Sequence, residues 1–283
     1  MNEVEMLIVG ANGQIGRALQ ALYPKAQIAD IDELDITNAQ SVAKYDWSKL
    51  KVVLNAAAYT NVDGAESAEG RVAAWKVNAT AVGYLTKAAL DHDLTVVHIS
   101  TEYVFDGTKN PHVEDESLSP LGVYAQSKAA GDIVVSTLPK HYIVRTNWVV
   151  GDGKNFVRTM LELGQKGINP SVIADDIGRP TFATEVARAI DHLLKNRALY
   201  GTYNASNDGD PVSWADLTRA VFATAGLKRT VTNTTSAEYY GDKPNAAPRP
   251  HNSIFDLSKL HATGFVSRDW REDLKVYIEK ELS

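Results

Sequence analysis

The sequence contains no cysteine among its 283 residues. Disulfide bonds, thiolate metal sites and a cysteine nucleophile are therefore excluded, and a reducing compartment is the natural setting. A long hydrophobic run is also missing near the start, where only residues 6–9 are continuously apolar before Gly10. A membrane-spanning helix needs about 20 apolar residues. We therefore expect a cytoplasmic protein that has no membrane partner.

Basic residues are scarce relative to acidic ones. The chain has 29 Lys and Arg against 35 Asp and Glu, which gives a formal net charge of -6. No long basic run offsets this balance, so nucleic acid is not expected as a partner. A small anionic ligand is compatible with the negative net charge, because helix N-termini and single arginines hold phosphate groups. The seven histidines show no metal-ligand spacing, and we expect no metal site.

Short apolar and β-branched runs recur along the first half of the chain, and each predicts a buried strand. They lie at residues 6–9, 27–32, 52–54, 95–99 and 142–144. Longer stretches with helical periodicity separate them, at residues 14–22 and 68–90. Such alternation is typical of an α/β fold whose parallel sheet is covered on both faces. We therefore predict a Rossmann-like, doubly wound sheet.

The regular alternation weakens from about residue 150, and a Pro-rich segment at 242–250 interrupts it further. We assign residues 1–150 to a dinucleotide-binding Rossmann domain and residues 151–283 to a smaller C-terminal α/β substrate lobe. An amphipathic helix at residues 184–194 is expected to return to the sheet, so that the first domain is rejoined by about 180–205.

A glycine-rich turn directly follows the first predicted strand. Its spacing is Gly-x-x-Gly-x-x-Gly. Glycines there allow a tight turn and a close approach of a pyrophosphate to backbone N–H groups at the N-terminus of the following helix. Such a turn can serve packing alone, but its place between a strand and a helix favours a dinucleotide site. Its predicted contacts are Gly10, Asn12, Gly13, Gln14, Ile15 and Gly16.

An acidic segment ends the second predicted strand. Either Asp30 or Asp32 stands where an acid bonds the adenosine ribose hydroxyls. Such an acid favours NAD over NADP, whereas Arg17 offers a cation that tolerates a 2′-phosphate, so NADH and NADPH both stay open. After the next strand, the run at residues 55–60 has small residues that leave room for a flat dinucleotide or for a neighbouring helix.

The segment that carries the predicted chemistry begins at the carboxyl end of the strand at residues 95–99. Ser100 and Thr101 place hydroxyls there, on the side of an open α/β sheet where ligands bind. Tyr124 and Lys128 follow in a helical stretch, and their spacing puts both on one helix face.

These side chains match the reduction of a ketone by a nicotinamide cofactor. Hydride delivery builds negative charge on the carbonyl oxygen, which Tyr124 neutralises as proton donor. The Lys128 ammonium is expected to lower the pKa of Tyr124 and to bond the nicotinamide ribose, while the Thr101 hydroxyl orients the carbonyl. A Tyr-x-x-x-Lys pair alone is common by chance. Here the pair follows a glycine turn, an acid and a Ser/Thr in the chain, and this order predicts an NAD(P)H-dependent oxidoreductase.

The motifs resemble the extended short-chain dehydrogenase/reductase superfamily and, more narrowly, the dTDP-4-dehydrorhamnose reductase family. The resemblance spans nearly the whole chain. The glycine turn is generic to the superfamily, whereas the later segments are more specific to the narrower family. Those segments are residues 35–37, 55–60, 62–66, 99–107, 124–128, 145–149, 153–156, 175–181 and 249–253.

The resemblance implies NAD(P)H-dependent reduction of the 4-keto group of dTDP-4-dehydro-β-L-rhamnose to give dTDP-β-L-rhamnose, an activated sugar for polysaccharide biosynthesis. Thr101, Tyr124 and Lys128 are the implied catalytic residues. Glu102 and Trp148 are implied sugar contacts, and Arg249 is the candidate for the nucleotide's phosphates. The implied cofactor contacts are Gly13, Gln14, Ile15, Asp30, Asp35, Ile36, Ala58, Tyr59 and Thr60.

The sequence departs from the family pattern at several positions. Glu102 stands where the family usually has Asp, and Ala125 where it commonly has Gly. Some family members pair through a magnesium ion held by acidic side chains, but the matching positions here are Ala18 and Thr184. We therefore expect a monomer or a weak homodimer without a bridging metal.

Two other functions stay open. One is a non-catalytic regulatory subunit that binds a dinucleotide, because the same fold resembles the β subunit of methionine adenosyltransferase. The retained Thr101, Tyr124 and Lys128 argue against it. The other is a different nucleotide-sugar 4-ketoreductase or an epimerase, which would keep the catalytic residues and change the substrate.

Overall fold

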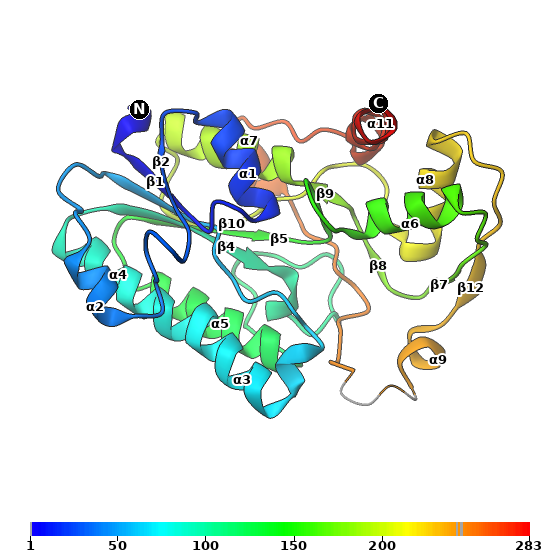
Figure 1. The fold of residues 1–283 in the computed structure, drawn as a ribbon, viewed down its shortest axis with the longest axis horizontal. Coiled ribbons are helices and arrows are strands. Elements are labelled where there is room, and N and C mark those ends of the chain that lie inside the picture. The colour runs from blue at the N-terminus through cyan, green and yellow to red at the C-terminus, as the bar shows by residue number, and fades with distance from the viewer. Residues whose placement is uncertain (1, 242, 244–245) are drawn as a thin grey trace.

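The computed structural model describes residues 2–241, 243 and 246–283, so part of the Pro-rich segment at 242–250 lies outside the described residues. Its centre is a six-stranded parallel sheet with the strand order β10-β5-β4-β3-β1-β2 (Figure 1). The central strands are apolar because helices cover both faces of the sheet. The predicted Rossmann-like, doubly wound fold is confirmed. The strands are β1 (Met6–Val9), β2 (Gln27–Ala29), β3 (Val52–Asn55), β4 (Thr95–Thr101), β5 (His141–Thr146) and β10 (Gly201–Asn204).

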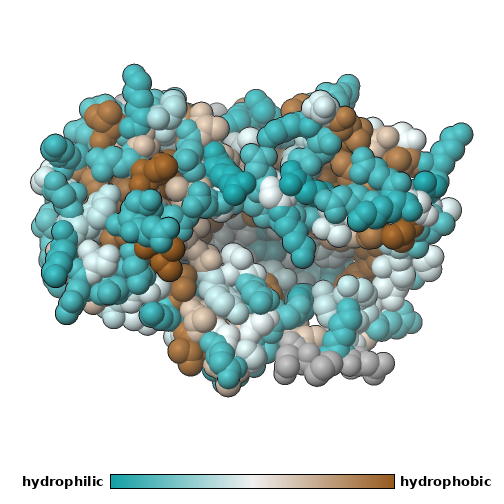
Figure 2. Space-filling view, in the orientation of Figure 1, coloured by the Kyte–Doolittle hydropathy of each residue, from teal (hydrophilic) through white to brown (hydrophobic). Residues whose placement is uncertain are grey.

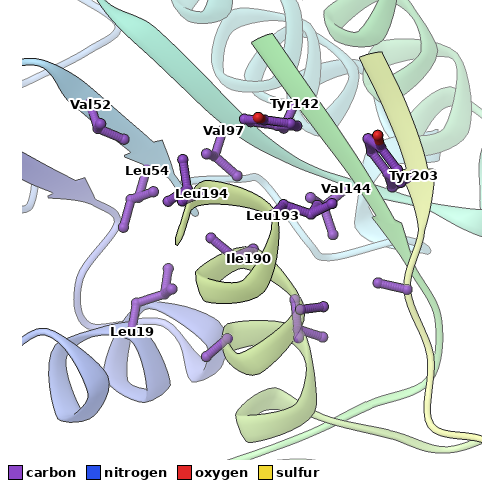
Figure 3. Packing of buried hydrophobic residues seen from close by; sticks show 14 of the residues in the cluster. Leu19, Val52, Leu54, Val97, Tyr142, Val144, Ile190, Leu193, Leu194 and Tyr203 are labelled. Carbon is purple, nitrogen blue, oxygen red and sulfur yellow. The ribbon is translucent and has the colours of Figure 1, made fainter. Parts of the chain in front are cut away.

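One face of the sheet is covered by α1 (Gln14–Leu22) and α7 (Ala183–Lys195), which pack against each other (Figure 1). Leu19 of α1 and Ile190 of α7 are buried with Leu54 of β3 in the core on this face (Figure 3). α7 thus lies on the sheet although it follows residue 150, and β10 after it pairs with β5. The division of the chain into two domains stays a prediction.

The opposite face of the sheet carries four helices. They are α2 (Ala39–Lys44), α3 (Ala68–Trp75), α4 (Ala81–Asp91) and α5 (Val123–Val135) (Figure 1). The single helix predicted at residues 68–90 is interrupted by a π-helical segment, Lys76–Thr80. This segment contains the buried Asn78, whose side chain accepts a hydrogen bond from the Tyr59 N–H (2.8 Å) and donates one to the Tyr59 carbonyl (3.1 Å). Asn78 thereby fixes the loop that follows β3.

A second group of short elements lies beside the sheet and has a hydrophobic core of its own, which includes Leu161, Val221 and Leu274 (Figure 1). We call this group the lobe. Its strands form the pairs β6-β9, β7-β12 and β8-β11. They are β6 (Val149–Val150), β7 (Ser171–Ile173), β8 (Ile177–Gly178), β9 (Thr181–Phe182), β11 (Val212–Ser213) and β12 (Thr232–Thr234). The remaining helices are α6 (Phe156–Gln165), α8 (Trp214–Thr224), α9 (Ser236–Tyr240), α10 (Ser258–His261) and α11 (Trp270–Leu282), with short 3₁₀ turns at Glu3–Glu5, Gly64–Glu66 and Glu102–Val104.

None of the helices that the structure describes is both long enough and apolar enough to cross a membrane.

Candidate active site

The surface is hollowed between the sheet and the lobe (Figure 2). The largest hollow there is a cavity of about 520 Å³, which we call the central cavity. It joins the glycine turn to the predicted catalytic side chains. The predicted site residues in its lining are Asn12, Gly13, Gln14, Ile15, Ala58, Thr60, Thr101, Glu102, Tyr124, Lys128 and Trp148.

The glycine turn is held by close backbone packing. Gly10 has a φ of +73°, and a Cβ atom there would lie 2.5 Å from the Ala57 nitrogen. A Cβ atom at Gly16 would lie 2.3 Å from the Gly10 carbonyl oxygen. α1 begins after Gly13, which has no side chain to cap its first N–H groups. These amides are therefore free to face an anion, as a dinucleotide pyrophosphate requires.

Gln14 gives a second indication that the turn fits a polar ligand. Its Oε1 atom is buried, and among the described residues it has no hydrogen-bond partner. Buried polar atoms are normally paired, so this atom favours a ligand at the start of α1. Gln14 lines the central cavity together with Asn12 and Ile15.

An acidic cavity of about 320 Å³ lies beyond the glycine turn. Of the two acids left open by the sequence, Asp30 lines this cavity, and its carboxylate accepts a hydrogen bond from the Asn12 N–H (3.2 Å). Asp32 is exposed. The Asp35 carboxylate accepts hydrogen bonds from the N–H and the hydroxyl of Thr37, which lower its pKa. Other predicted cofactor residues in the lining are Gly10, Gly13, Ile36 and Ala58.

Two predicted cofactor residues have packing positions instead. Gly16 is buried beneath the Gly10 carbonyl. Tyr59 packs with Val62 and Tyr103 against the cluster that contains Tyr124. Both residues pack against other residues of the site. The sequence pattern does not distinguish such packing from direct contact with a cofactor.

Lys128 is buried on the face of α5 that it shares with Tyr124. Its Nζ donates a hydrogen bond to the Ile99 carbonyl (2.7 Å) and lies 3.5 Å from Nε2 of His98. Burial lowers the pKa of Lys128 to about 8, and the Asp132 carboxylate opposes this change. An ammonium group has three N–H donors, so the carbonyl of β4 orients the group and leaves donors for a ligand in the central cavity.

The pKa of Tyr124 differs from the expectation. Burial raises it above the ordinary value of a phenol, the Glu102 carboxylate raises it further, and the Thr101 hydroxyl opposes the rise. The structure therefore does not show the lowering that we predicted from Lys128. The reason is that the Lys128 ammonium is directed to the Ile99 carbonyl, whereas the phenol is buried near a carboxylate.

Thr101 and Glu102 form a hydrogen-bonded pair beside Tyr124. The Thr101 hydroxyl donates to Oε2 of Glu102 at 2.7 Å and accepts from the Tyr103 N–H at 3.2 Å. Glu102 is 3% exposed, and burial raises its pKa to about 7, with the Thr101 hydrogen bond opposing the rise. Near neutral pH this carboxyl group therefore exchanges between its neutral and charged forms.

Arg249 lies outside the central cavity, in a neighbouring cavity of about 230 Å³. Its guanidinium group donates to Oδ1 of Asp63 (2.7 Å) and lies 4.3 Å from the centre of the Tyr240 ring. We call this the aromatic cavity, because several Trp, Tyr and Phe side chains line it. Its lining includes Tyr103, Trp148, Phe156, Trp214, Tyr239, Tyr240 and Arg249.

Trp148 and Tyr103 line both the central and the aromatic cavity, so the two are adjacent. The substrate residues predicted from the sequence are thus divided between two connected spaces. The aromatic residues of the lobe, among them Trp214 at the start of α8 and Tyr239 on α9, were not predicted, because no motif in the sequence marks them as cavity residues. Asp132 was also missed, although it follows Lys128 by one helical turn on the same face as Tyr124.

No group of three or more His, Asp or Glu side chains is placed to hold a metal ion within the described ranges 2–241, 243 and 246–283. Ala18 and Thr184 lie on α1 and α7.

A family model and curated relatives of known name indicate the same family for this chain. The model described as RmlD substrate binding domain matches residues 4–283. A dTDP-4-dehydrorhamnose reductase of Aggregatibacter actinomycetemcomitans is 39% identical, over 95% of this chain and 97% of that protein. A probable dTDP-4,6-dihydroxy-2-methyloxan-3-one 4-ketoreductase of Streptomyces antibioticus is 35% identical, over 95% of this chain and 92% of that protein.

Solved structures agree with these relatives. The dTDP-4-dehydrorhamnose reductase of Clostridium acetobutylicum superimposes with a TM-score of 0.91 and 37% identity, covering 98% of this chain and 99% of that one. The enzyme of the same name from Bacillus anthracis, solved in complex with NADP, gives a TM-score of 0.89 and 36% identity, covering 99% of both chains. The match of the family model over residues 4–283, together with relatives of this similarity, shows that the chain belongs to the dTDP-4-dehydrorhamnose reductase family.

Proposed function

We propose that this chain catalyses the NAD(P)H-dependent reduction of the 4-keto group of dTDP-4-dehydro-β-L-rhamnose to give dTDP-β-L-rhamnose. The observation that carries the proposal is that Thr101, Tyr124 and Lys128 line one cavity with the start of α1. A dinucleotide on the glycine turn would supply the hydride. The relatives named as dTDP-4-dehydrorhamnose reductases, one of them solved with NADP, support the same substrate and cofactor.

Tyr124 acts as the proton donor. Its raised pKa keeps the phenol protonated at neutral pH, so the side chain starts the reaction as an acid. The ammonium of Lys128, held by the Ile99 carbonyl, has donors left for the nicotinamide ribose of a bound dinucleotide. Thr101 turns its hydroxyl from Glu102 to the carbonyl oxygen of the substrate and orients it.

The remaining residues divide by cavity. Asp30, Asp35, Ile36 and Ala58, which line the acidic cavity, would hold the adenosine half of a dinucleotide. Its pyrophosphate and nicotinamide ribose would be held by Gly10, Asn12, Gly13, Gln14, Ile15, Thr60 and Lys128, and Gly16 and Tyr59 would support these contacts. Glu102 and Trp148 contact the sugar, and Arg249 contacts the phosphates of the sugar nucleotide.

The decisive experiment mixes the protein with dTDP-4-dehydrorhamnose and either NADH or NADPH. We expect the absorbance of the reduced nicotinamide to fall with both cofactors at measurable rates. The proposal is overturned if neither NADH nor NADPH supports turnover. Such a result, combined with tight dinucleotide binding and co-purification with a larger synthetase, would instead favour a regulatory subunit.

A different 4-ketoreductase is the second candidate, because one relative that is 35% identical has another keto sugar in its name. The two candidates are separated by the ratio of kcat/KM for the two dTDP-keto sugars. An epimerase would retain bound NAD⁺ without net consumption of cofactor.

We propose that the protein is a monomer or a weak homodimer in the cytoplasm, and that neither nucleic acid nor a membrane is its partner. The lack of cysteine and the net charge of -6 support this assignment.

A further inference from the structure

Trp148 has an unusual backbone conformation. Its φ of +42° lies in the left-handed region, which a bulky side chain adopts only where the surrounding structure holds it. The residue stands between β5 and β6, at the border of the sheet and the lobe. Strain of this kind concentrates at ligand-binding sites, and Trp148 lines both the central and the aromatic cavity.

The main chain around Trp148 is fixed from the lobe. The Trp148 carbonyl accepts a hydrogen bond from the Thr181 N–H (3.1 Å). The preceding residue, Asn147, accepts one from the Thr181 hydroxyl (2.7 Å) and donates one to the Ser253 carbonyl (2.6 Å). These bonds hold the chain in place but leave the direction of the indole ring undetermined.

The ring direction is set by Trp214, the first residue of α8. The two indoles are stacked, with ring centroids 3.5 Å apart and planes 13° from parallel. Phe156 lies against Trp214 with a centroid distance of 4.5 Å. The Trp148 ring also lies on Gly178, where a Cβ atom would be 2.8 Å from Cε2 of the indole. Both Trp214 and the bare backbone of Gly178 are therefore needed for this ring position.

Trp214 lines the aromatic cavity and not the central one. Trp148, on which it stacks, lines both cavities and so connects Trp214 with the central one. The position of Trp214 is defined by α8, whose N-cap Ser213 accepts a hydrogen bond from the Asp216 N–H (3.0 Å).

We propose that Trp214 is a positioning residue for the reduction: by stacking on Trp148 it fixes the wall between the two cavities, so that a nucleotide sugar spanning them presents its keto carbon to Tyr124. Gly178 serves the same end by leaving room for the ring. This inference rests on the proposed function. It adds two residues of the lobe that do not touch the central cavity to the determinants of substrate placement.

The test compares Trp214→Leu with Trp214→Phe and with Trp75→Phe as control. Trp75 is 41% exposed on α3 and lies in the lining of neither cavity. For Trp214→Leu we expect a loss in kcat/KM of about 10- to 100-fold, from misplacement of the keto carbon relative to Tyr124, with kcat falling most. The Kd for NADH should not change. Trp214→Phe keeps a flat ring and should recover most of the loss.

Gly178→Ala is the independent variant, since it leaves Trp214 intact and pushes on the Trp148 ring. It should lower kcat for the sugar nucleotide in the same way. The stack itself is read by near-ultraviolet circular dichroism, because two parallel indoles couple their transitions. We expect Trp214→Leu to remove this coupled signal and Trp75→Phe to keep it.

Loss of the coupled signal with a kcat equal to that of Trp75→Phe, in both Trp214→Leu and Gly178→Ala, overturns the inference. If Trp214→Leu does not fold, Gly178→Ala decides by the same criterion. Failure of the proposed function is a separate result, since then the wild-type protein itself shows no turnover while its dichroism signal is still present.

Discussion

The two walls of the cleft are built differently. On the sheet side, Thr101 ends β4 and the Tyr124–Lys128 pair sits on α5, all of them buried. On the lobe side, Trp214 begins α8, Tyr240 ends the short helix α9, and Arg249 lies in a loop. Proton and hydride transfer require atoms fixed to within fractions of an ångström, which strands and long helices provide. Recognition of a substrate tolerates side chains carried by loops, which differ more freely between relatives.

The largest effect is expected on the sheet side, from Tyr124→Phe. Removing the proton donor should lower kcat by roughly 10²- to 10⁴-fold, because general acid catalysis contributes that much. The dinucleotide Kd, measured by fluorescence titration, should stay nearly unchanged. Tyr200→Phe, at the 47% exposed Tyr200, is the matched control and should keep full activity. Full activity of Tyr124→Phe would refute the assigned role and with it the contrast between the walls.

Glu102→Gln should change how stability depends on pH. The folded pKa of Glu102 is about 7, above its ordinary 4.5. Its contribution to stability is therefore complete below pH 4.5 and is lost as the pH rises through about 7. A neutral glutamine escapes this loss, so the wild type should lose up to roughly 3 kcal/mol relative to the variant between those values.

The comparison is made by denaturant unfolding at pH 5 and pH 8. Glu279→Gln, at an exposed position of α11, serves as the control and should show no such divergence. Parallel stability curves for wild type and Glu102→Gln would mean that the carboxyl group is not desolvated as the structure has it.

Gly10→Ala tests the backbone packing of the sheet wall. The new Cβ atom would meet the Ala57 nitrogen at 2.5 Å in a left-handed conformation, so we expect a destabilisation of roughly 1–3 kcal/mol and loss of dinucleotide binding. Gly13→Ala is the matched variant. Its φ is -71°, and its Cβ would lie 3.3 Å from the Gly10 oxygen, so it should weaken binding while the Tm stays close to that of the wild type. Equal falls in Tm would contradict this distinction.

The smallest effect is expected on the lobe side, from Arg249→Gln. Losing one charged hydrogen bond to the substrate phosphates should raise the KM for the sugar nucleotide about tenfold, with kcat little changed. Asp63→Asn is informative beside it, because it frees the guanidinium from its carboxylate partner and should leave the KM equal or lower. If Arg249→Gln lowered kcat as much as Tyr124→Phe, the lobe side would contribute to the chemical step and not only to substrate binding.

The same division governs what could be predicted from the sequence. α1, β1 and the Tyr124–Lys128 face of α5 were predicted because each depends on periodicity or on glycine at fixed spacing, which are local properties. The prediction of one helix at residues 68–90 did not include the π-helical segment. That segment contains Asn78, whose side chain bonds the backbone N–H and carbonyl of Tyr59, and a contact between separate elements leaves no local pattern in the sequence. The stack of Trp148 on Trp214 joins residues 66 positions apart, by their numbers, with no repeating pattern between them.

The sequence by itself determined the doubly wound sheet, the glycine turn and the candidate catalytic residues, since strand alternation, helix period and turn chemistry act over a few neighbouring residues. The tertiary structure decided the protonation tendencies and the partners. Burial sets the pKa of Glu102 near 7 and that of Lys128 near 8, and the Ile99 carbonyl directs the ammonium. Desolvation and aromatic stacking depend on which distant segments meet, and only the folded chain brings them together.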